Sequence, residues 1–429
     1  MRTLIISDLH LGSNSGSDLL RRPELRAELL AAAADVDRVV LLGDVLELRH
    51  GPLREAMAVA RPFFEDLGRV LAGKELVITA GNHDHALVEP WLAHRGEETE
   101  PPPLVVEQLL EPAQASPALQ RIAEWATPAH VRVAYPGLWV RADVYATHGH
   151  FLDCHLTVPT LERLSVAAMS RLLTRPADSF DCVGDYEAMG APVFAWRDAV
   201  ARDARTGAGL NGLATVTAWR ALRGKRPGEG RRAIAEEAAR SGNNGRAAGV
   251  GSEAHDGQPA GASGSRPEQG RRGRGLVART GALELRSRAI RAAFPLAISA
   301  LNRAGLGPLR ADVSPDELRR AGLLAMGEVA ARLGLSDAYV VFGHTHRAGP
   351  LPGDDQREWR GRQGARLVNA GSWTYAAIFL TGTPGESPYW PGTCVLVEDS
   401  GPPLLKRLLQ DRTHAQIAPA PRRPSRVAS

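Results

Sequence analysis

The chain begins with MRTLIISDLHLG (residues 1–12), in which the apolar run Leu4–Ser7 is followed directly by Asp8 and His10. Four later segments repeat this arrangement of a short, β-rich apolar run and a polar cluster. They are Val39–Leu42 before Gly43-Asp44, Leu76–Thr79 before Gly81-Asn82-His83-Asp84, Val144–Ala146 before Thr147-His148-Gly149-His150, and Tyr339–Phe342 before Gly343-His344-Thr345-His346. Such runs, bounded by glycine and polar residues, are typical of strands that are buried on both faces.

The segments between the first strands have the spacing of helices. Leu19–Ala34 and Glu55–Leu71 follow the first two predicted strands, and this alternation predicts an α/β domain. In open α/β sheets, ligands bind where the strands end. We therefore expect the five polar clusters to meet in space, although they span positions 8 to 346.

Length and composition bound the organisation of the chain. Its 429 residues are enough for two or three domains, and 44% of them are hydrophobic, which excludes a wholly disordered or coiled-coil protein. The formal net charge is +4, and residues 224–275 alone carry ten Lys or Arg against six Asp or Glu. Because this segment also has 13 glycines and no aromatic residue, we expect a disordered loop. Without aromatic residues for base stacking, a nucleic-acid groove has little support there.

A long interval with helical spacing separates the fourth cluster from the fifth. Its predicted helices are Leu156–Leu173, Ala191–Arg205, Arg286–Leu301 and Pro315–Leu333. We interpret residues 156–336 as a helical cap inserted into the α/β domain and interrupted by the loop 224–275. The α/β core then consists of residues 1–155 and 337–411, and we expect a disordered tail over residues 412–429.

Cysteine usage and hydropathy indicate the compartment. Cys154, Cys182 and Cys394 are widely spaced and form no CxxC pair, which is typical of a reducing compartment. The N-terminus lacks the basic start, apolar stretch and cleavage site of a signal peptide. No apolar run reaches the ~18 residues of a transmembrane helix. We expect a cytoplasmic protein, and peripheral contact with a membrane stays open.

The polar clusters contain carboxylates and imidazoles but no thiolate. This set of ligands suits borderline-hard divalent metals such as Mn, Fe, Zn or Co. Asp8 and His10 are two residues apart, so their side chains leave the strand end on the same side. His344 and His346 repeat this spacing on another strand.

Asp44 is suited to bridge two ions, because its carboxylate has two oxygens. Asn82 adds a neutral amide oxygen, and His148 adds another nitrogen. Two ions about 3.5–4 Å apart hold a bridging hydroxide and clamp a phosphoryl group for in-line displacement. The pKa of metal-bound water falls to about 7, so hydroxide forms at neutral pH. A single ion would leave several of these ligands without a role.

Together the polar clusters resemble the motif set of a known family, the calcineurin-like metallophosphoesterases. The matching blocks are Asp8-Leu9-His10, Gly43-Asp44-Val45-Leu46-Glu47, Gly81-Asn82-His83-Asp84, His148-Gly149 and Gly343-His344-Thr345-His346. They stand in the family's order, and the resemblance covers residues 1–155 and 337–410. It implies a four-layer αββα sandwich with a dinuclear metal centre at the edge of the sheets.

The resemblance also implies a role for each matched residue. One ion takes Asp8, His10, Asp44 and His346, and the other takes Asp44, Asn82, His148 and His344. His83 lies just outside the metals as a general acid, and Asp84 orients it. The ions are two divalent metals, with manganese favoured and iron, zinc or cobalt as the alternatives.

Several further polar residues stand near strand ends without a clear assignment. Glu47 occupies a position where the family often has Asp or Glu, but an exposed charge or a local salt bridge fits equally well. His150 either orients substrate or stabilises its loop. A structural role is favoured for Asn369 and Ser372 over support of His344. The remaining candidates are interpreted as solvated loop positions: His50, His85, Asp153 and His155.

The substrate is less well defined than the chemistry. The SDLHLG start and the insertion after the fourth block are similar to the bacterial UDP-2,3-diacylglucosamine hydrolases, which cleave a diphosphate in a lipid-linked nucleotide sugar. His83 stands where that branch has arginine, and His150 stands where it has an acidic residue, so that substrate is not transferred. We expect a phosphohydrolase for a small or lipid-linked phosphoester or pyrophosphate. The alternatives are a cyclic-nucleotide phosphodiesterase or nuclease of the same superfamily, and a metal-free scaffold on this fold.

Overall fold

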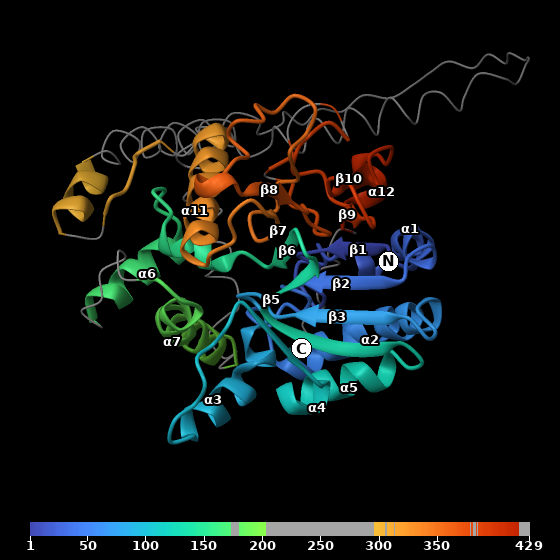
Figure 1. Cartoon of the computed structure of the whole chain (residues 1–429). Helices are drawn as coiled ribbons and strands as arrows, with labels where there is room; N and C mark the ends of the chain where they lie inside the picture. Colours follow the sequence, from blue (N-terminus) through green and yellow to red (C-terminus); the bar gives the residue numbers. More distant parts are fainter. Residues whose placement is uncertain are drawn as a thin grey trace, which may run out of the picture.

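The computed structural model describes residues 1–172, 180–202, 296–304, 307–312, 314–377, 379–380, 383 and 385–419 (Figure 1). The predicted loop 224–275 and the first ten residues of the predicted helix Arg286–Leu301 therefore lie outside the described residues.

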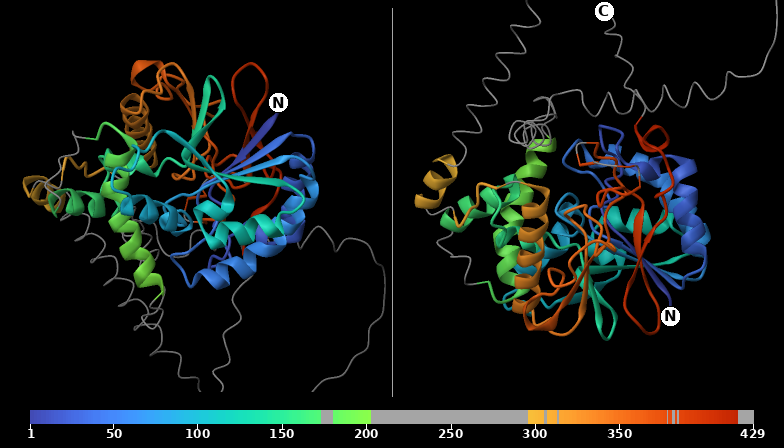
Figure 2. Two further views of the ribbon diagram at one scale, coloured as in Figure 1. Left: turned by 60° about the horizontal axis from the view of Figure 1, so that its bottom comes forward. Right: turned by 90° about the horizontal axis from the view of Figure 1, so that it is seen from above.

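The described strands form one ten-stranded sheet in the order β10-β9-β1-β2-β3-β5-β6-β7-β8, with β4 paired to β5. Their bounds are β1 Thr3–Ile6, β2 Arg38–Leu42, β3 Glu75–Thr79, β4 Glu107–Leu110, β5 His130–Arg141, β6 Val144–Thr147, β7 Tyr339–Phe342, β8 Arg366–Asn369, β9 Thr393–Val397 and β10 Leu404–Arg407. Strands β1, β2, β3 and β5 are parallel, as are β6, β7 and β8, and the antiparallel pair β5–β6 joins the two halves. Figure 2 shows the C-terminal strands, in red, beside β1.

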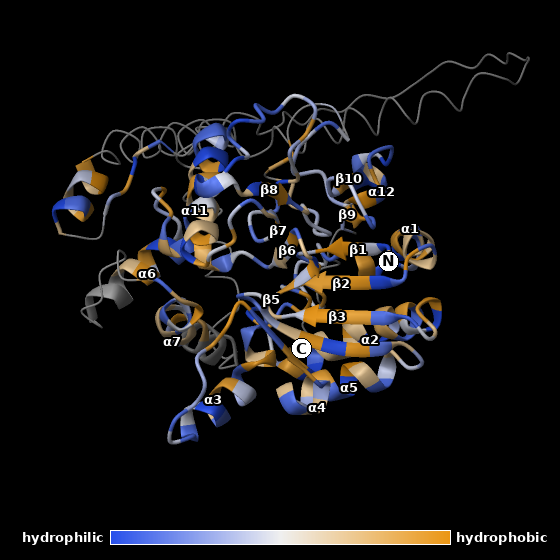
Figure 3. Cartoon of the chain, viewed as in Figure 1, coloured by the Kyte–Doolittle hydropathy of each residue, from blue (hydrophilic) through white to orange (hydrophobic). Residues whose placement is uncertain are grey.

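The sheet is curled so that its inner face packs on itself. Ile5 of β1, Val341 of β7 and Val395 of β9 belong to one buried cluster made of residues from both halves. The neighbouring residues point outward, and Leu4 packs in a cluster with the helices of the first half, whereas Phe342 packs in a cluster with those of the second half. Because side chains alternate along a strand, this division gives four layers, helix–sheet–sheet–helix. Figure 3 shows that β1, β2 and β3 are predominantly apolar, as two buried faces require.

The first helical layer covers β1, β2, β3 and β5. It contains α1 (Pro23–Ala34), α2 (Leu53–Val70) and α5 (Pro117–Trp125), with α3 (Glu89–Glu97) and α4 (Pro112–Ala115) beside them (Figure 1). In α2, the buried residues Met57, Ala60, Phe64 and Leu67 recur at helical spacing and form the face that packs on the sheet.

The second helical layer is built largely by α11 (Pro315–Arg332), which the sequence analysis assigned to the cap. Ser314 caps this helix, because its side chain accepts a hydrogen bond from the Glu317 N–H at 3.2 Å. Its buried residues Met326 and Val329 lie in the same cluster as Val340 of β7. The helix is therefore part of the sandwich, and the boundary predicted at residue 337 is corrected to the start of α11.

The rest of the insertion packs beside this layer. It contributes α6 (Leu161–Leu172), α7 (Val183–Arg202) and a helix over residues 296–303. Tyr186 and Met189 of α7 are fully buried, and the Tyr186 ring stacks on Phe151 with 4.9 Å between centroids. Figure 1 shows α6 and α7 near one end of α11.

The C-terminal segment is ordered further than predicted. Residues His414–Ile417 form the short helix α12, and the Ile417 side chain is fully buried against the first layer. The predicted disordered tail therefore begins too early at residue 412, and residues 420–429 lie outside the described part. Within the described residues, no helix is both long and apolar enough to cross a membrane.

Candidate metal centre

The five polar clusters meet at one edge of the curled sheet. Asp8 and His10 follow β1, Asp44 follows β2, Asn82 and His83 follow β3, His148 follows β6, and His344 and His346 follow β7. These side chains form three groups, and within each group the ligand atoms lie within 4.8 Å of one another. The groups are Asp8–His10–His346, His10–Asp44–His83 and Asp44–His148–His344. The convergence expected from the strand ends is therefore present.

Two histidines of one lobe donate from the outer ring nitrogen, so in the neutral ring the inner nitrogen is the one that is bare. His148 Nδ1 lies 3.0 Å from the carbonyl oxygen of Leu42, which only accepts, so this nitrogen carries the proton. His344 Nε2 lies 3.1 Å from both carboxylate oxygens of Asp153 and donates in the same way. The outer partner thus fixes the ring orientation and makes the inner nitrogen a ligand, as in known metal sites.

The histidines of the other lobe follow the same pattern. His10 Nδ1 lies 3.1 Å from Glu47 Oε2, and His346 Nδ1 lies 3.3 Å from the Thr374 hydroxyl. Their Nε2 atoms face each other at 3.2 Å, and Asp8 Oδ1 lies 3.2 Å from His346 Nε2. Each of the four rings is therefore held from outside and turned toward the centre.

The inner atoms of the first lobe fit a cation. Asn82 Oδ1 lies 3.2 Å from His148 Nε2 and 3.2 Å from His344 Nδ1, while Asp44 Oδ2 lies 3.4 Å from His148 Nε2. These atoms face one another with their lone pairs, and a swapped Asn82 amide would relieve the contacts by donating instead. In the swapped orientation the Asn82 side-chain oxygen accepts from Arg49 Nη2 at 2.9 Å instead. In the unswapped orientation a cation at the centre would satisfy this oxygen together with Asp44 Oδ2 and the two inner nitrogens.

The backbone at the ligand positions is strained. Five residues adopt the left-handed conformation that non-glycine residues rarely take: Asp8 (φ 58°), His10 (φ 47°), Asp44 (φ 50°), His344 (φ 66°) and His346 (φ 59°). Such strain persists only where the surrounding structure imposes it, and it gathers at functional sites. Two strands thus aim pairs of side chains at one point by sharp turns at their ends.

Close packing at the centre explains a glycine of the third block. A Cβ atom on Gly81 would lie 2.3 Å from Asp44 Oδ1, which is too close for any side chain. The loop after β3 therefore passes directly against the Asp44 carboxylate. The Asp44 Oδ1 atom also accepts a hydrogen bond from the His83 backbone N–H at 2.7 Å, which fixes its orientation.

The electrostatics of the centre favour anionic carboxylates and protonated imidazoles when no cation is bound. Burial raises the pKa of Asp8, but the facing His346 and His10 outweigh it and hold this pKa far below its usual value. Burial lowers the pKa of His148, but Asp44 outweighs it and raises this pKa to about 9. Because a metal needs the bare nitrogen, its binding at His148 releases a proton.

Comparison with known protein families agrees with this geometry. Residues 1–181 match the profile described as calcineurin-like phosphoesterase. The chain carries a calcineurin-like phosphoesterase domain. Members of this family are metal-dependent phosphoesterases, and the groups of His and Asp side chains are able to bind divalent metal. A comparison with curated proteins gives no significant match.

In this calcineurin-like phosphoesterase domain, His83 contacts Glu47 rather than Asp84. Its Nδ1 atom lies 3.0 Å from both Glu47 oxygens, so the predicted orienting role of Asp84 is corrected to Glu47. Burial lowers the pKa of His83 to about 4, aided by the Arg49 guanidinium and opposed by Glu47 and Asp44. The His83 ring is therefore neutral at neutral pH and donates its Nδ1 proton to Glu47.

Asp84 has a structural role instead. Its carboxylate accepts hydrogen bonds from the backbone N–H groups of Val45 and Gly81, both at 2.7 Å, and of Leu46 at 3.1 Å. Burial and the neighbouring Asp44 raise the pKa of Asp84 to about 6. The residue ties the loop after β3 to the loop after β2, so it positions both loops without touching His83.

Two further residues that the sequence analysis placed in solvated loops, His85 and His155, contact helix α7 instead. His85 Nε2 lies 2.7 Å from Glu187 of α7, whose second oxygen accepts from the Tyr135 hydroxyl at 2.5 Å. His155 Nε2 lies 2.8 Å from the Tyr186 hydroxyl. Spacing alone gives no sign of these contacts, because both partners of the histidines lie on α7 or β5, far away in the sequence.

The structure also corrects the substrate-binding role of His150. The ring is 3% exposed, packs edge-on against Phe151 and Phe194, and forms no hydrogen bond among the described residues. Burial, followed by the charge of His148, keeps the pKa of His150 well below 6.5. His150 is therefore packed among Phe151, Phe194 and the His148 ring, whose centroid lies 5.6 Å away, and it supports the loop from inside.

Replacement of His150 by Phe should change how stability depends on pH. The unfolded state binds a proton on His150 below about pH 6.5 and the folded state does not, so this residue costs stability as the pH falls. We expect the variant to gain roughly 1 kcal/mol over the parent between pH 7.5 and 5.5. Urea unfolding of both proteins in EDTA measures this difference. An unchanged difference across the pH range would mean that His150 takes up a proton in the folded protein as readily as in the unfolded chain.

Replacement of Asp153 by Asn should weaken metal binding. The Asp153 carboxylate is 4% exposed and holds His344 Nε2, and partners of this kind typically contribute 10–100-fold to metal affinity. Calorimetric titration with Mn²⁺ measures the loss, which we expect at one of the two sites. The matched control is Asp143→Asn, which removes an exposed partner of Arg141 away from the centre. Equal affinities in Asp153→Asn and the parent would contradict the positioning role.

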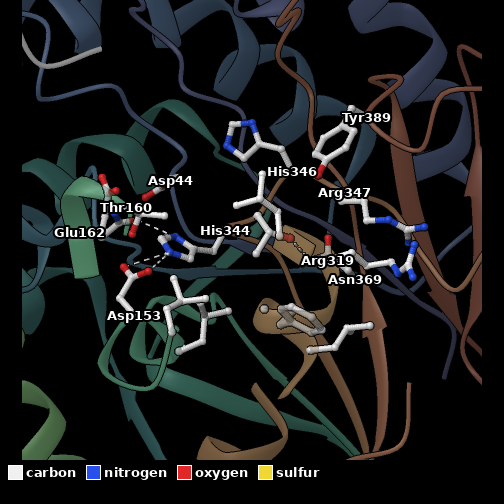
Figure 4. Close-up of a pocket in the computed structure, with 18 of the residues that line it drawn as sticks. Asp44, Asp153, Thr160, Glu162, Arg319, His344, His346, Arg347, Asn369 and Tyr389 are labelled. Carbon is white, nitrogen blue, oxygen red and sulfur yellow. Dashed lines mark hydrogen bonds and ion pairs between the residues drawn. The ribbon is translucent and has the colours of Figure 1, made fainter. Parts of the chain in front are cut away.

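A cavity of about 280 Å³ opens beside the metal centre (Figure 4). Asp44, Asn82, His83, His344 and His346 line one end of it. The remaining lining comes from Glu162 of α6, the loop before α6, helix α11, strand β7 and the segments after β7. Figure 4 shows the His344 ring facing Asp153, with Glu162 and Thr160 on the side of α6. The insertion and α11 thus form walls of the cavity that contains the ligand groups.

Proposed function

We propose that the protein is a dinuclear metal-dependent phosphohydrolase, which cleaves a phosphoester or pyrophosphate bond in a small or lipid-linked substrate. The observation that carries this proposal is the adjacency of two lobes of inward-facing ligand atoms that share Asp44, 3.6 Å from His10 Nε2 and 3.4 Å from His148 Nε2. One ion would be held by Asp8, His10, Asp44 and His346, and the other by Asp44, Asn82, His148 and His344. Manganese is the favoured metal.

Divalent ions in these positions polarise phosphoryl oxygens and lower the pKa of bound water to about 7. The chain supplies the rest of the chemistry. Asp44 and Asn82 would hold the ions at the cavity end. His83 stands at the border, with Nε2 at 4.0 Å from Asp44 Oδ2 and its side chain 23% exposed.

The proposed general-acid role of His83 depends on the bound substrate. The ring is neutral in the free site, and a phosphoryl dianion beside it favours the protonated form by attraction. Glu47, which already accepts the Nδ1 proton, stabilises the charged ring and leaves the Nε2 proton for the departing oxygen. The leaving group then departs as a neutral alcohol rather than as an alkoxide.

The cavity and the thiols support the remaining expectations. Its volume and helical walls favour a small molecule over a nucleic-acid strand. Cys154, Cys182 and Cys394 are free thiols, which fits a cytoplasmic location.

The test is a substrate panel with manganese-loaded protein and parallel metal analysis. The panel compares p-nitrophenyl phosphate and its diesters, alkyl phosphates, nucleotide diphosphate sugars, cyclic nucleotides and single-stranded DNA. We expect two bound ions per chain and turnover of at least one small phosphoester, which a chelator abolishes. Less than one ion per chain, or two ions without turnover of any substrate, would contradict the proposal.

A further inference from the structure

The cavity beside the metal centre has a largely apolar lining away from the ligand groups. Its apolar walls come from three parts of the fold, namely the segment before α6, helix α11, and the strand β7 with the later loops. The residues are Leu152, Leu156, Leu318, Leu323, Phe342 and Trp359. Leu323 and Phe342 are 5% and 1% exposed, so these walls are packed parts of the second layer and not loose surface.

The two arginines in these walls are already neutralised by carboxylates. Arg319 donates to Glu358 from Nε at 2.9 Å and to Asp316 from Nη1 at 2.7 Å. Arg347 forms a two-atom contact with Asp354, at 2.9 Å and 2.5 Å, and lies over the Trp359 ring. Figure 4 shows Arg319 and Arg347 on the side of the cavity away from Asp153 and Glu162.

The Asn369 side chain in these walls also has its hydrogen-bonding groups satisfied. The Asn369 amide donates to the Gly343 carbonyl and to the Thr345 hydroxyl, both at 2.9 Å, and its oxygen accepts from the Gly371 N–H. Glu162 of α6 also lines the cavity, and its carboxylate offers no positive charge to a second phosphate. Among the described residues of the cavity, the cationic groups outside the histidines therefore have carboxylate partners.

We propose that the substrate is an ester with a single phosphoryl group and an apolar, uncharged leaving group that occupies this cavity. The proposal rests on the proposed phosphohydrolase function and adds the substrate class. The phosphoryl group belongs at the histidine end of the cavity, where the histidines and the bound ions would compensate its negative charge. A second phosphate would lie among leucine and aromatic side chains, and an anion buried without a partner is strongly disfavoured.

An alkyl series tests the apolar contact without changing the leaving-group chemistry. Ethyl, butyl and hexyl phosphate release alcohols of nearly equal acidity, so differences between them report binding of the chain. Each methylene buried in the cavity is expected to raise kcat/KM by about fourfold. Hexyl diphosphate, which differs from hexyl phosphate by one phosphate, is expected to react at least tenfold less efficiently.

A pair of leucines on α11 provides a matched control. Leu318 lines the cavity, whereas Leu324 is 64% exposed on the same helix. Leu318→Arg places a cation in the apolar wall, so it should flatten the alkyl series and improve use of hexyl diphosphate. Leu324→Arg adds the same charge on the exposed face of α11. It should leave the alkyl series and the use of hexyl diphosphate unchanged.

Calorimetric binding of alkylphosphonates to the metal-loaded protein tests the apolar site separately from the phosphohydrolase activity. Tighter binding of hexylphosphonate than of ethylphosphonate supports the apolar site even without turnover. Equal kcat/KM and equal binding along the alkyl series, or a preference for hexyl diphosphate, would overturn the proposed substrate class. In that case, turnover of p-nitrophenyl phosphate would still support the phosphohydrolase function. Absence of turnover with every ester would overturn the proposed function itself.

Discussion

Asp44→Asn should abolish nearly all activity and release at least one metal ion, while the fold is retained. Asp44 takes part in two of the three ligand groups and lies between the two lobes. Asparagine has almost the same volume and keeps the oxygen that accepts from the His83 N–H, but it removes the negative charge between the cations. If the lost charge destabilises the transition state by about 4 kcal/mol, the rate falls roughly 10³-fold.

Metal analysis, kcat/KM for p-nitrophenyl phosphate, and thermal unfolding in EDTA measure the three parts of this prediction. Asp18→Asn is the control, because Asp18 is equally buried and accepts from the Gly12 N–H outside the ligand groups. It should keep two ions and near-normal activity. Two bound ions and full activity in Asp44→Asn would show that Asp44 does not bridge.

His83→Ala should produce a defect that depends on the leaving group. An alkoxide needs a proton as the P–O bond breaks, and a positioned acid typically supplies ~10²–10⁴-fold in rate. A p-nitrophenolate ion leaves without help. We therefore expect a severe loss for alkyl phosphates, a modest loss for p-nitrophenyl phosphate, and a metal content close to that of the parent protein. Measurement of kcat/KM for both esters beside metal analysis gives the answer.

Glu47→Gln provides a second variant for the same hypothesis. Glutamine keeps the volume at a position that is 3% exposed, but it no longer favours a protonated His83. Because Glu47 also holds His10 Nδ1, some loss of metal is expected here, whereas His83→Ala should show none. A uniform loss on both esters, or a drop in metal content in His83→Ala, would assign His83 to packing or to metal binding.

The sequence was sufficient to predict the layout of the centre because each ligand stands at the end of a short apolar strand. Asp8, Asp44 and His344 are recognisable from that position alone, and the sheet then brings them together. The alternation of predicted strands with helical segments also predicted the α/β class correctly. The local sequence therefore identifies the strand ends, and the parallel pairing of the strands brings these ends together.

Features that depend on distant partners could not be predicted in this way. Strand β5 contains Pro136, which has no backbone N–H to donate to a neighbouring strand. The pairing of β5 with β4 shifts in register at this point, where Glu107 lies opposite both Pro136 and Gly137, and the shift accommodates the proline ring. Glu47 and Asp84 both carry carboxylates near His83, and only the three-dimensional path of the loops decides which one contacts the ring. For α11, the helical pattern was clear, but the pattern does not say which surface it covers.

The strand order has a consequence for how the protein is made. β1 lies between β2 and β9, so the pairing of β1 is complete only after β9 has left the ribosome. The metal centre combines His148 with His344, so it also needs the later part of the chain. At roughly 5–20 residues per second, synthesis from His148 to His344 takes about ten seconds or more. During that interval the nascent chain exposes the inner apolar face of its first strands and one free edge of β1. Newly made chains are thus open to premature pairing at these strands, and the full set of metal ligands exists only after His346 has been synthesised.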